Sequence, residues 1–255
     1  MQLLESVSAL SGSGAMAWLL IAIPLASAAF LLLAGKLTDP WGHLLATLAP
    51  IVSFVLGLLL FVQLLGSPED ARHIDVSVYE WISTGAWSIE FGLLVDPLSI
   101  LFVLLITGVG SLIHVYSIGY MAHDDRRRRF FAYLNLFIAA MLTLVLANNY
   151  LVLFLGWEGV GLASFLLISF WAHKPSAAAA GNKAFIVNRV GDLGLSMAIF
   201  TMLAMFGSVN FADVNAGAES LDPVWATIIG MLLLPGACGK SAQVPLHSWL
   251  LDAME

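Results

Sequence analysis

Long apolar stretches separated by short polar connections dominate the chain. An α-helix needs about 20 mostly apolar residues to cross the hydrocarbon core of a bilayer, which is about 30 Å thick. We therefore predict a transmembrane helix wherever a stretch reaches that length. The predicted spans lie at about 16–34, 44–65, 97–118, 130–147, 150–171, 184–206 and 224–250. The predicted fold is an all-α, polytopic transmembrane helix bundle of about seven spans.

The last apolar stretch is too long for one straight helix and contains helix-breaking residues. These are Pro235, Gly236, Gly239 and Pro245. Proline removes a hydrogen-bond donor and clashes with the preceding turn, so we predict two half-helices joined by an unwound segment. In a membrane such a break persists only where protein covers it or where it lines a wet cavity. The break is therefore a first indication of function.

The connection at about 66–96 differs from the others because it is acidic and aromatic. Its polar and apolar positions alternate, which predicts a short β-hairpin. We divide the chain accordingly. Residues 1–96 hold the first two helices and this outer loop, and residues 97–255 hold the remaining transmembrane helices.

Composition supports a membrane protein and excludes several kinds of site. The chain is 60% hydrophobic and 11% charged, whereas about a quarter of the residues of a soluble domain are charged. The single cysteine, Cys238, excludes an internal disulfide and an all-cysteine metal or iron–sulfur site. The histidines show no metal-ligand spacing, and no arrangement indicates nucleophilic catalysis. We predict no metal and no cofactor site in this chain.

The basic residues predict the orientation of the helices. One set of alternate connections holds only Arg72, and the other holds Lys36, Arg126, Arg127, Arg128, Arg129, Lys174 and Lys183. The positive-inside rule places the second set in the cytoplasm and the N-terminus outside. The HDDRRRR run thus serves as an orientation signal beside the lipid bilayer, and we predict no nucleic-acid partner. The N-terminus lacks the basic residues of a cleaved signal peptide, so we expect the first apolar segment to be kept.

Ionisable residues also fall inside the predicted spans. They are Glu158, Arg189, Asp192 and Lys240. Each charge at a helix centre costs about 2.5–3.5 kcal/mol on insertion scales, and intramembrane ionisable groups mark functional sites by default. Glu158 lies about a third of the way across its span and must be paired or neutral. The alternative is a neutral glutamate that only bonds two helices together.

Spacing along the chain indicates which of these groups meet. Arg189 and Asp192 are three residues apart and share a helix face, so they form either a structural ion pair or part of a charge pathway. Lys240 has no acid within helical reach, and Glu158 is its candidate partner. His247 follows Lys240 by two helical turns, so it either relays a proton or meets interfacial water. Together these residues predict a buried proton-transfer line.

The GKS sequence around Lys240 has another interpretation, as the end of a phosphate-binding loop. That loop needs a glycine five residues before the second glycine, and the position holds Leu234. The loop must also follow a strand, whereas here it follows a continuous apolar run. A soluble nucleotide-binding protein remains an alternative that nucleotide binding in detergent would support.

Several long motifs resemble one family. They are FGLLVDPLSILFVLLITGVGSLIHVYSIGYM, FFAYLNLFIAAMLTLVLANNYLVLFLGWEGVGLASFLLISFW, NKAFIVNRVGDLG and GACGKSAQVPLHSWL followed by DAM. They are similar to the antiporter-like subunit L (chain 5) of proton-pumping NADH:quinone oxidoreductase, respiratory complex I. The corresponding antiporter-like subunit of the multisubunit Na⁺/H⁺ antiporters shares them and is the alternative. A pore-less membrane scaffold is a second alternative.

The resemblance implies roles for the charged residues. Glu158 would be the glutamate of the fifth helix and Lys240 the lysine of the broken seventh helix, with proton transfer through this pair. Arg189 and Asp192 would match the charges of the sixth helix, and His247 a position that is often histidine. NADH, flavin, iron–sulfur clusters and quinone would bind to partner subunits of a hetero-oligomer with other membrane subunits in the bacterial inner membrane.

The sequence departs from the family pattern in two respects. Leu251 stands where the family usually has proline, which would loosen the second half-helix. Family members also continue beyond the position of Glu255 with further helices. We therefore expect only part of a proton path in these residues.

Overall fold

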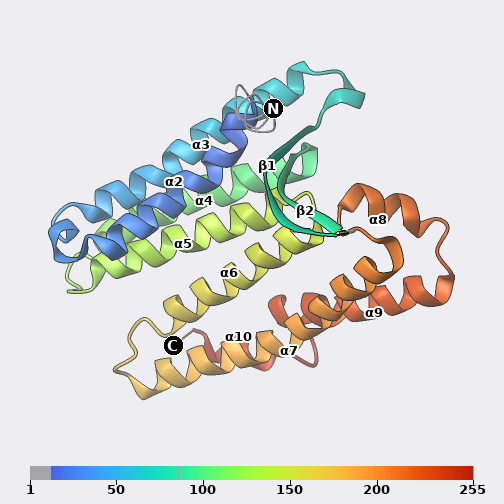
Figure 1. The fold of residues 1–255 in the computed structure, drawn as a ribbon. Coiled ribbons are helices and arrows are strands. Elements are labelled where there is room, and N and C mark those ends of the chain that lie inside the picture. Colours follow the sequence, from blue (N-terminus) through green and yellow to red (C-terminus); the bar gives the residue numbers. More distant parts are fainter. Residues whose placement is uncertain (1–12, 86, 255) are drawn as a thin grey trace.

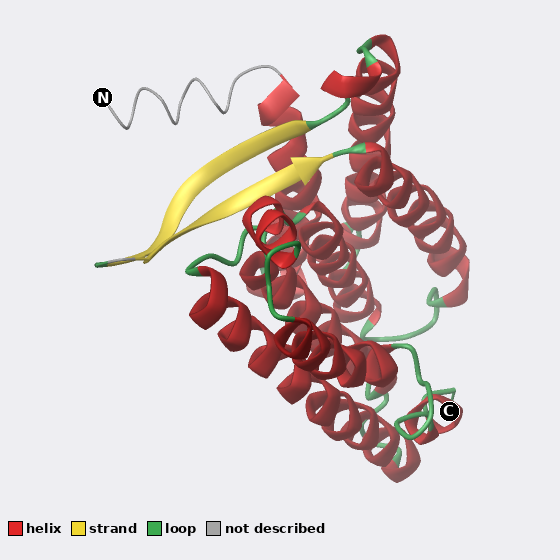
Figure 2. Ribbon diagram, turned by 90° about the vertical axis from the view of Figure 1, so that its right-hand side faces the viewer, coloured by secondary structure: helices red, strands yellow, loops and turns green. Residues whose placement is uncertain are grey.

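The described part of the chain is a bundle of long helices with one β-hairpin at its edge (Figure 1, Figure 2). The computed structural model describes residues 13–85 and 87–254. Its long helices are α2 (Ser13–Leu33), α3 (Gly42–Gly66), α4 (Pro97–Tyr120), α5 (Arg127–Leu146), α6 (Tyr150–Ile168), α7 (Pro175–Phe206) and α9 (Pro223–Lys240). These seven helices are long and apolar enough to cross a membrane. The predicted polytopic helix bundle is therefore confirmed.

The helices pack mostly against their neighbours in the sequence (Figure 1). Helices α2 to α5 form one group, α7 and α9 form another, and α6 lies between them, packed on α5 and α7. Glycines permit the close approaches. A Cβ on Gly156 of α6 would lie 2.5 Å from the backbone nitrogen of Leu144 in α5. One on Gly191 of α7 would lie 2.6 Å from the carbonyl oxygen of Pro235 in α9.

The predicted hairpin is present between α3 and α4. Strands β1 (Ile74–Thr84) and β2 (Trp87–Val95) pair antiparallel and extend along one end of the bundle (Figure 2). Its buried side chains, including Leu93 and Val95, share a hydrophobic core with residues of α2, α3 and α5. The alternating pattern of the sequence therefore identified both the strands and their inward face.

An asparagine fixes the hairpin to the start of α6. The Asn149 amide nitrogen donates to the carbonyl oxygen of Glu90 in β2 at 3.0 Å. Its side-chain oxygen accepts from the backbone N–H groups of Leu151 and Val152 and so caps the helix. The helix that carries Glu158 is thus attached at its first turn to the sheet.

Some boundaries differ from the prediction. Helix α7 begins at Pro175 rather than near residue 184, because an alanine-rich segment that is too polar to count as a span continues the helix backwards. Proline in its first turn is favourable there. The structure also has short elements below the length of a span: η1 (Gly35–Thr38), η2 (Glu69–Ala71), α8 (Phe211–Ala218) and α10 (Ser248–Asp252).

The break in the last span lies later than the prolines and glycines of α9 indicated. Helix α9 continues through Pro235 and ends at Lys240. Residues 241–247 are not helical and contain a cis Val244–Pro245 peptide bond, and α10 is only five residues long. The expectation of an unwound segment is confirmed, but the second half-helix is much shorter than predicted.

Candidate functional site

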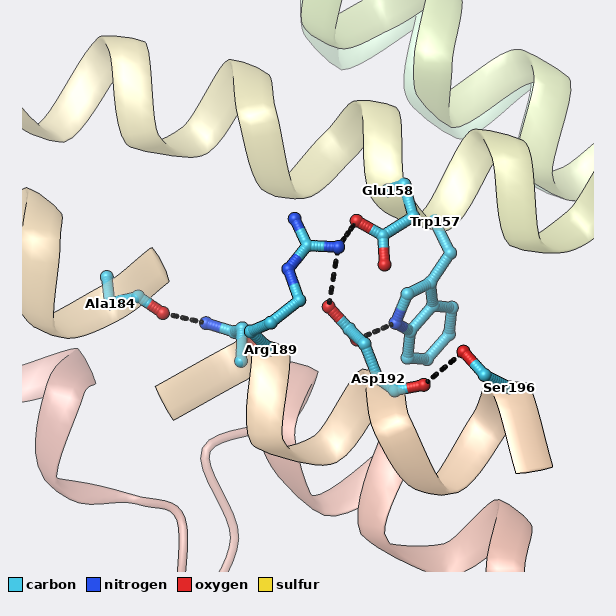
Figure 3. A network of polar contacts seen from close by, with 7 residues as sticks. Trp157, Glu158, Ala184, Arg189, Asp192 and Ser196 are labelled. Atoms are coloured by element: carbon cyan, nitrogen blue, oxygen red, sulfur yellow. Dashed lines mark hydrogen bonds and ion pairs between the residues drawn. The ribbon is translucent and has the colours of Figure 1, made fainter. Parts of the chain in front are cut away.

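Helices α6 and α7 face each other across a network of charged and aromatic side chains (Figure 3). Arg189 and Asp192 lie on the same face of α7, and their Nη1 and Oδ2 atoms are 4.0 Å apart. The Asp192 side chain is only 4% exposed, whereas that of Arg189 is 46% exposed. The predicted shared face is confirmed.

Glu158 pairs with Arg189. Oε2 of Glu158 accepts a hydrogen bond from Nη1 of Arg189, across the contact between α6 and α7 (Figure 3). Its other oxygen, Oε1, is buried without a hydrogen-bond partner among the described residues. The prediction that Lys240 is the direct partner of Glu158 is therefore wrong for this structure. Spacing along the chain did not show that Arg189 reaches across to the neighbouring helix.

Lys240 instead lies over an aromatic ring. It is the last residue of α9, and its Nζ is 5.9 Å from the centroid of the Trp157 ring, within the range of a cation–π contact. Gly161, one turn after Trp157, leaves space for the ammonium group, because a Cβ there would lie 2.7 Å from Nζ. Asp192 is the carboxylate that acts electrostatically on Lys240.

Trp157 links the two helices and the lysine. Its indole Nε1 donates to Oδ1 of Asp192 at 2.6 Å, while its ring faces Lys240 (Figure 3). The sequence interpretation concentrated on Glu158 and missed this neighbour. A usable signal was present, since a tryptophan N–H in an apolar helix needs an acceptor and Asp192 was a buried acceptor without a donor.

A cavity joins these groups. Its volume is about 710 Å³, and its lining is mostly apolar. The titratable groups Arg189, Asp192 and Lys240 line it together with the polar side chains of Asn188 and Ser164. A space of this size with several polar partners can hold water molecules, so proton exchange among the three charged groups is chemically feasible.

His247 does not lie where the sequence placed it. It is exposed at the start of α10. The prediction of two helical turns from Lys240 is wrong, because the intervening residues 241–247 are not helical. Trp249, two residues later, is the side chain that turns back to α9, donating from Nε1 to the carbonyl oxygen of Gly239 at 3.0 Å.

Nothing in the site resembles a place for a metal ion. Within residues 13–85 and 87–254, no group of three or more histidine, cysteine or acidic side chains is positioned to hold one. The groups that are present can accept, donate and exchange protons.

Two family descriptions match the chain. Residues 147–255 match the transmembrane region described as "NADH:quinone oxidoreductase/Mrp antiporter". Residues 81–131 match the N-terminus of chain 5 of NADH-ubiquinone oxidoreductase (complex I). The matched residues include all four intramembrane charges.

Curated relatives carry the same description. The chain is 56% identical over 238 residues to NADH-quinone oxidoreductase subunit L of Mycobacterium tuberculosis, covering 93% of this chain and 38% of that protein. It is 48% identical over 183 residues to the Escherichia coli subunit L, covering 69% of this chain and 29% of that protein. The chain thus spans well under half the length of these relatives.

Solved structures share the fold. The Mrp complex of a Dietzia species superposes with a TM-score of 0.78 at 28% identity, over 93% of this chain and 25% of that chain. An archaeal membrane-bound sulfane sulfur reductase superposes with a TM-score of 0.77 at 19% identity, over 93% of this chain and 47% of that chain, and shows the fold alone.

Proposed function

The chain belongs to the antiporter-like membrane subunits described as subunit L or chain 5 of NADH:quinone oxidoreductase, and we propose that it translocates protons as part of such a complex. The observation that carries the proposal is the meeting of two acids and two bases, Glu158, Asp192, Arg189 and Lys240, in membrane-spanning helices beside one cavity. Buried structural pairing alone needs no shared cavity.

Lys240 is the proton carrier in this proposal. Arginine stays charged at any physiological pH, whereas lysine loses its proton readily when it is buried. Arg189 is therefore the fixed cation that neutralises Glu158, and Lys240 is the cation that changes state. A carboxylate near Lys240 favours proton uptake, and withdrawal of that carboxylate or approach of Arg189 favours release. The unpaired Oε1 of Glu158 offers Lys240 an acceptor if Arg189 moves away.

The energy source lies outside the chain in this proposal. Other subunits of a hetero-oligomer bind NADH, flavin, iron–sulfur clusters and quinone, and quinone reduction there drives the rearrangement of the charges. The subunit sits in a bacterial inner membrane with its N-terminus outside. Residues 97–255 supply the antiporter-like helices, and residues 1–96 supply the two preceding helices and the outer hairpin.

The test uses the full-length subunit in its assembled complex, reconstituted in proteoliposomes. Glu158→Gln and Lys240→Ala should lower proton pumping per NADH oxidised while leaving assembly largely intact. Lys183→Ala is a matched control, because Lys183 is a cation of α7 whose partner is Asp252 and it lies outside the residues that line the cavity. Normal pumping in both site variants would contradict the proposal.

A multisubunit Na⁺/H⁺ antiporter is the second candidate, favoured by the structural match to the Dietzia Mrp complex. Co-purification with small antiporter subunits, together with Na⁺-dependent proton movement, would support it against NADH-oxidising partners. A pore-less scaffold, the third candidate, predicts that the Glu158 and Lys240 variants lose thermal stability and keep wild-type transport.

A further inference from the structure

A second cluster of buried polar side chains lies among helices α2 to α5, on residues that the Glu158–Lys240 site does not use. Its central members are His114 of α4, which is 1% exposed, and Asn135 of α5, which is 0% exposed. Each has one side-chain atom without a hydrogen-bond partner among the described residues, Nε2 of His114 and Oδ1 of Asn135. Buried polar atoms without a partner are rare in proteins.

The hydrogen bonds of Asn135 determine the direction of its amide. The nitrogen donates to Oγ of Ser27 in α2 at 2.9 Å and to the carbonyl oxygen of Ala46 in α3 at 3.1 Å. A carbonyl oxygen only accepts, so the nitrogen must occupy this position and both of its hydrogens are used. The remaining atom, Oδ1, is an acceptor that needs a donor.

The hydrogen bond of His114 determines its tautomer in the same way. Its Nδ1 lies 2.7 Å from the carbonyl oxygen of Gly110, so Nδ1 carries the hydrogen. No charged side chain is among the groups that act on this imidazole. A buried cation without a counter-charge is unfavourable, so the ring is neutral. In a neutral imidazole with hydrogen on Nδ1, Nε2 is an acceptor.

Two acceptors thus lie on neighbouring side chains, since Asn135 is the side chain beside the His114 ring. They cannot bond to each other, and one donor with two hydrogens satisfies both. The imidazole also borders a hollow of about 430 Å³ in which it is the one titratable lining group. The Ser27 hydroxyl, which accepts from Asn135, has a hydrogen of its own to donate. A water needs two to four such partners.

We propose that His114 and Asn135 bind one internal water molecule, which donates one hydrogen to Nε2 of His114 and the other to Oδ1 of Asn135. This site is separate from the cavity of Lys240, although Phe137 and Met141 line both hollows. It gives the α2–α5 group a hydrated titratable side chain, and it does not depend on whether the protein pumps protons.

The test is a map of the assembled full-length complex by cryo-electron microscopy, at a resolution that shows ordered water. The wild type should show a water within hydrogen-bond distance of both acceptors. His114→Phe keeps the ring and removes the nitrogens, so the water should be absent. Ser111→Ala is the control, because this buried hydroxyl of α4 bonds only to the carbonyl oxygen of Thr107, and its map should keep the water.

Several results would overturn the inference. One is a wild-type map with no density between the two side chains. Another is a direct contact between Nε2 and Oδ1, which would mean that His114 is protonated. A third is a water that persists in His114→Phe. The wild-type map decides the question by itself if the variant does not assemble.

Discussion

A single methyl group at Gly161 should move the ammonium group of Lys240 without disturbing the fold. A Cβ at this position would lie 2.7 Å from Nζ of Lys240, and that atom is its one neighbour within 4 Å. An ordinary contact needs about 3.5 Å, so Nζ must move by about 0.8 Å. The atom that must move is the end of a flexible side chain, so the backbones of α6 and α9 can stay in place.

The energetic effects of Gly161→Ala have opposite signs. Alanine stabilises a helix by about 1 kcal/mol relative to glycine. The cation–π contact between Lys240 and Trp157 contributes about 0.5–2 kcal/mol, and the displaced ammonium loses part of it. Overall stability should therefore change little. A loss of about 1 kcal/mol at Lys240 alone changes the occupancy of its position over the ring roughly fivefold.

Proton pumping per NADH oxidised, measured in proteoliposomes beside the melting temperature of the complex, tests this reasoning. We expect Gly161→Ala to lower pumping severalfold while the melting temperature stays near that of the wild type. Gly230→Ala is the matched control, because it lies in α9 with nothing within 4 Å of the position that its methyl carbon would take, and it should leave both quantities unchanged. Wild-type pumping by Gly161→Ala would refute the role assigned to this lysine position.

Two further predictions concern hydrogen bonds to carboxylates. Trp157→Phe keeps the ring under Lys240 but removes the donor to the buried Asp192, so unfolding in detergent should become easier by about 1–3 kcal/mol, whereas Trp225→Phe, on an exposed part of α9, should have no effect; equal stability of the two variants would contradict the argument. In the connection between α4 and α5, partial burial raises the pKa of Asp124, but bonds donated by Trp171 and by the Arg126 backbone outweigh it and hold the pKa below 3.8. The stabilisation is thus present above pH 3.8 and lost as pH falls through the lowered pKa, so Asp124→Asn should destabilise slightly, by less than about 1 kcal/mol, at neutral pH only, measured by Trp171 fluorescence in thermal melts; a penalty that persists in acid would contradict this.

Hydropathy identified the spans because burial in a bilayer dominates the energetics of each apolar segment. The start of α7 at Pro175 escaped that reasoning, since alanine-rich polar residues form a helix without being apolar enough to span. The position of the break escaped it for another reason. Proline inside a helix is tolerated where neighbouring groups pack against it, and Gly191 of α7 lies directly against the carbonyl oxygen of Pro235.

The candidate site could be predicted as a set of residues but not as a set of pairs. Cost arguments select every charge inside a span, and they selected Glu158, Arg189, Asp192 and Lys240. Which cation meets which carboxylate depends on helix order and rotation, and a single sequence does not contain that information. The shared face of Arg189 and Asp192 was predictable because it is set within one helix.

The observed pairing changes which residue controls Lys240. If Glu158 were its direct partner, the protonation of Lys240 would depend on the contact between α6 and α9. With Arg189 on Glu158, the nearby influences on Lys240 are Asp192 and Arg189, which are both on α7. A rotation or shift of α7 moves the attracting and the repelling charge together, so small displacements of one helix alter the balance at the lysine. Trp157 restrains that motion, because it holds Asp192 and faces Lys240 at the same time. Coupling to a distant reaction therefore requires a force on α7, and no direct contact between Glu158 and Lys240 is needed.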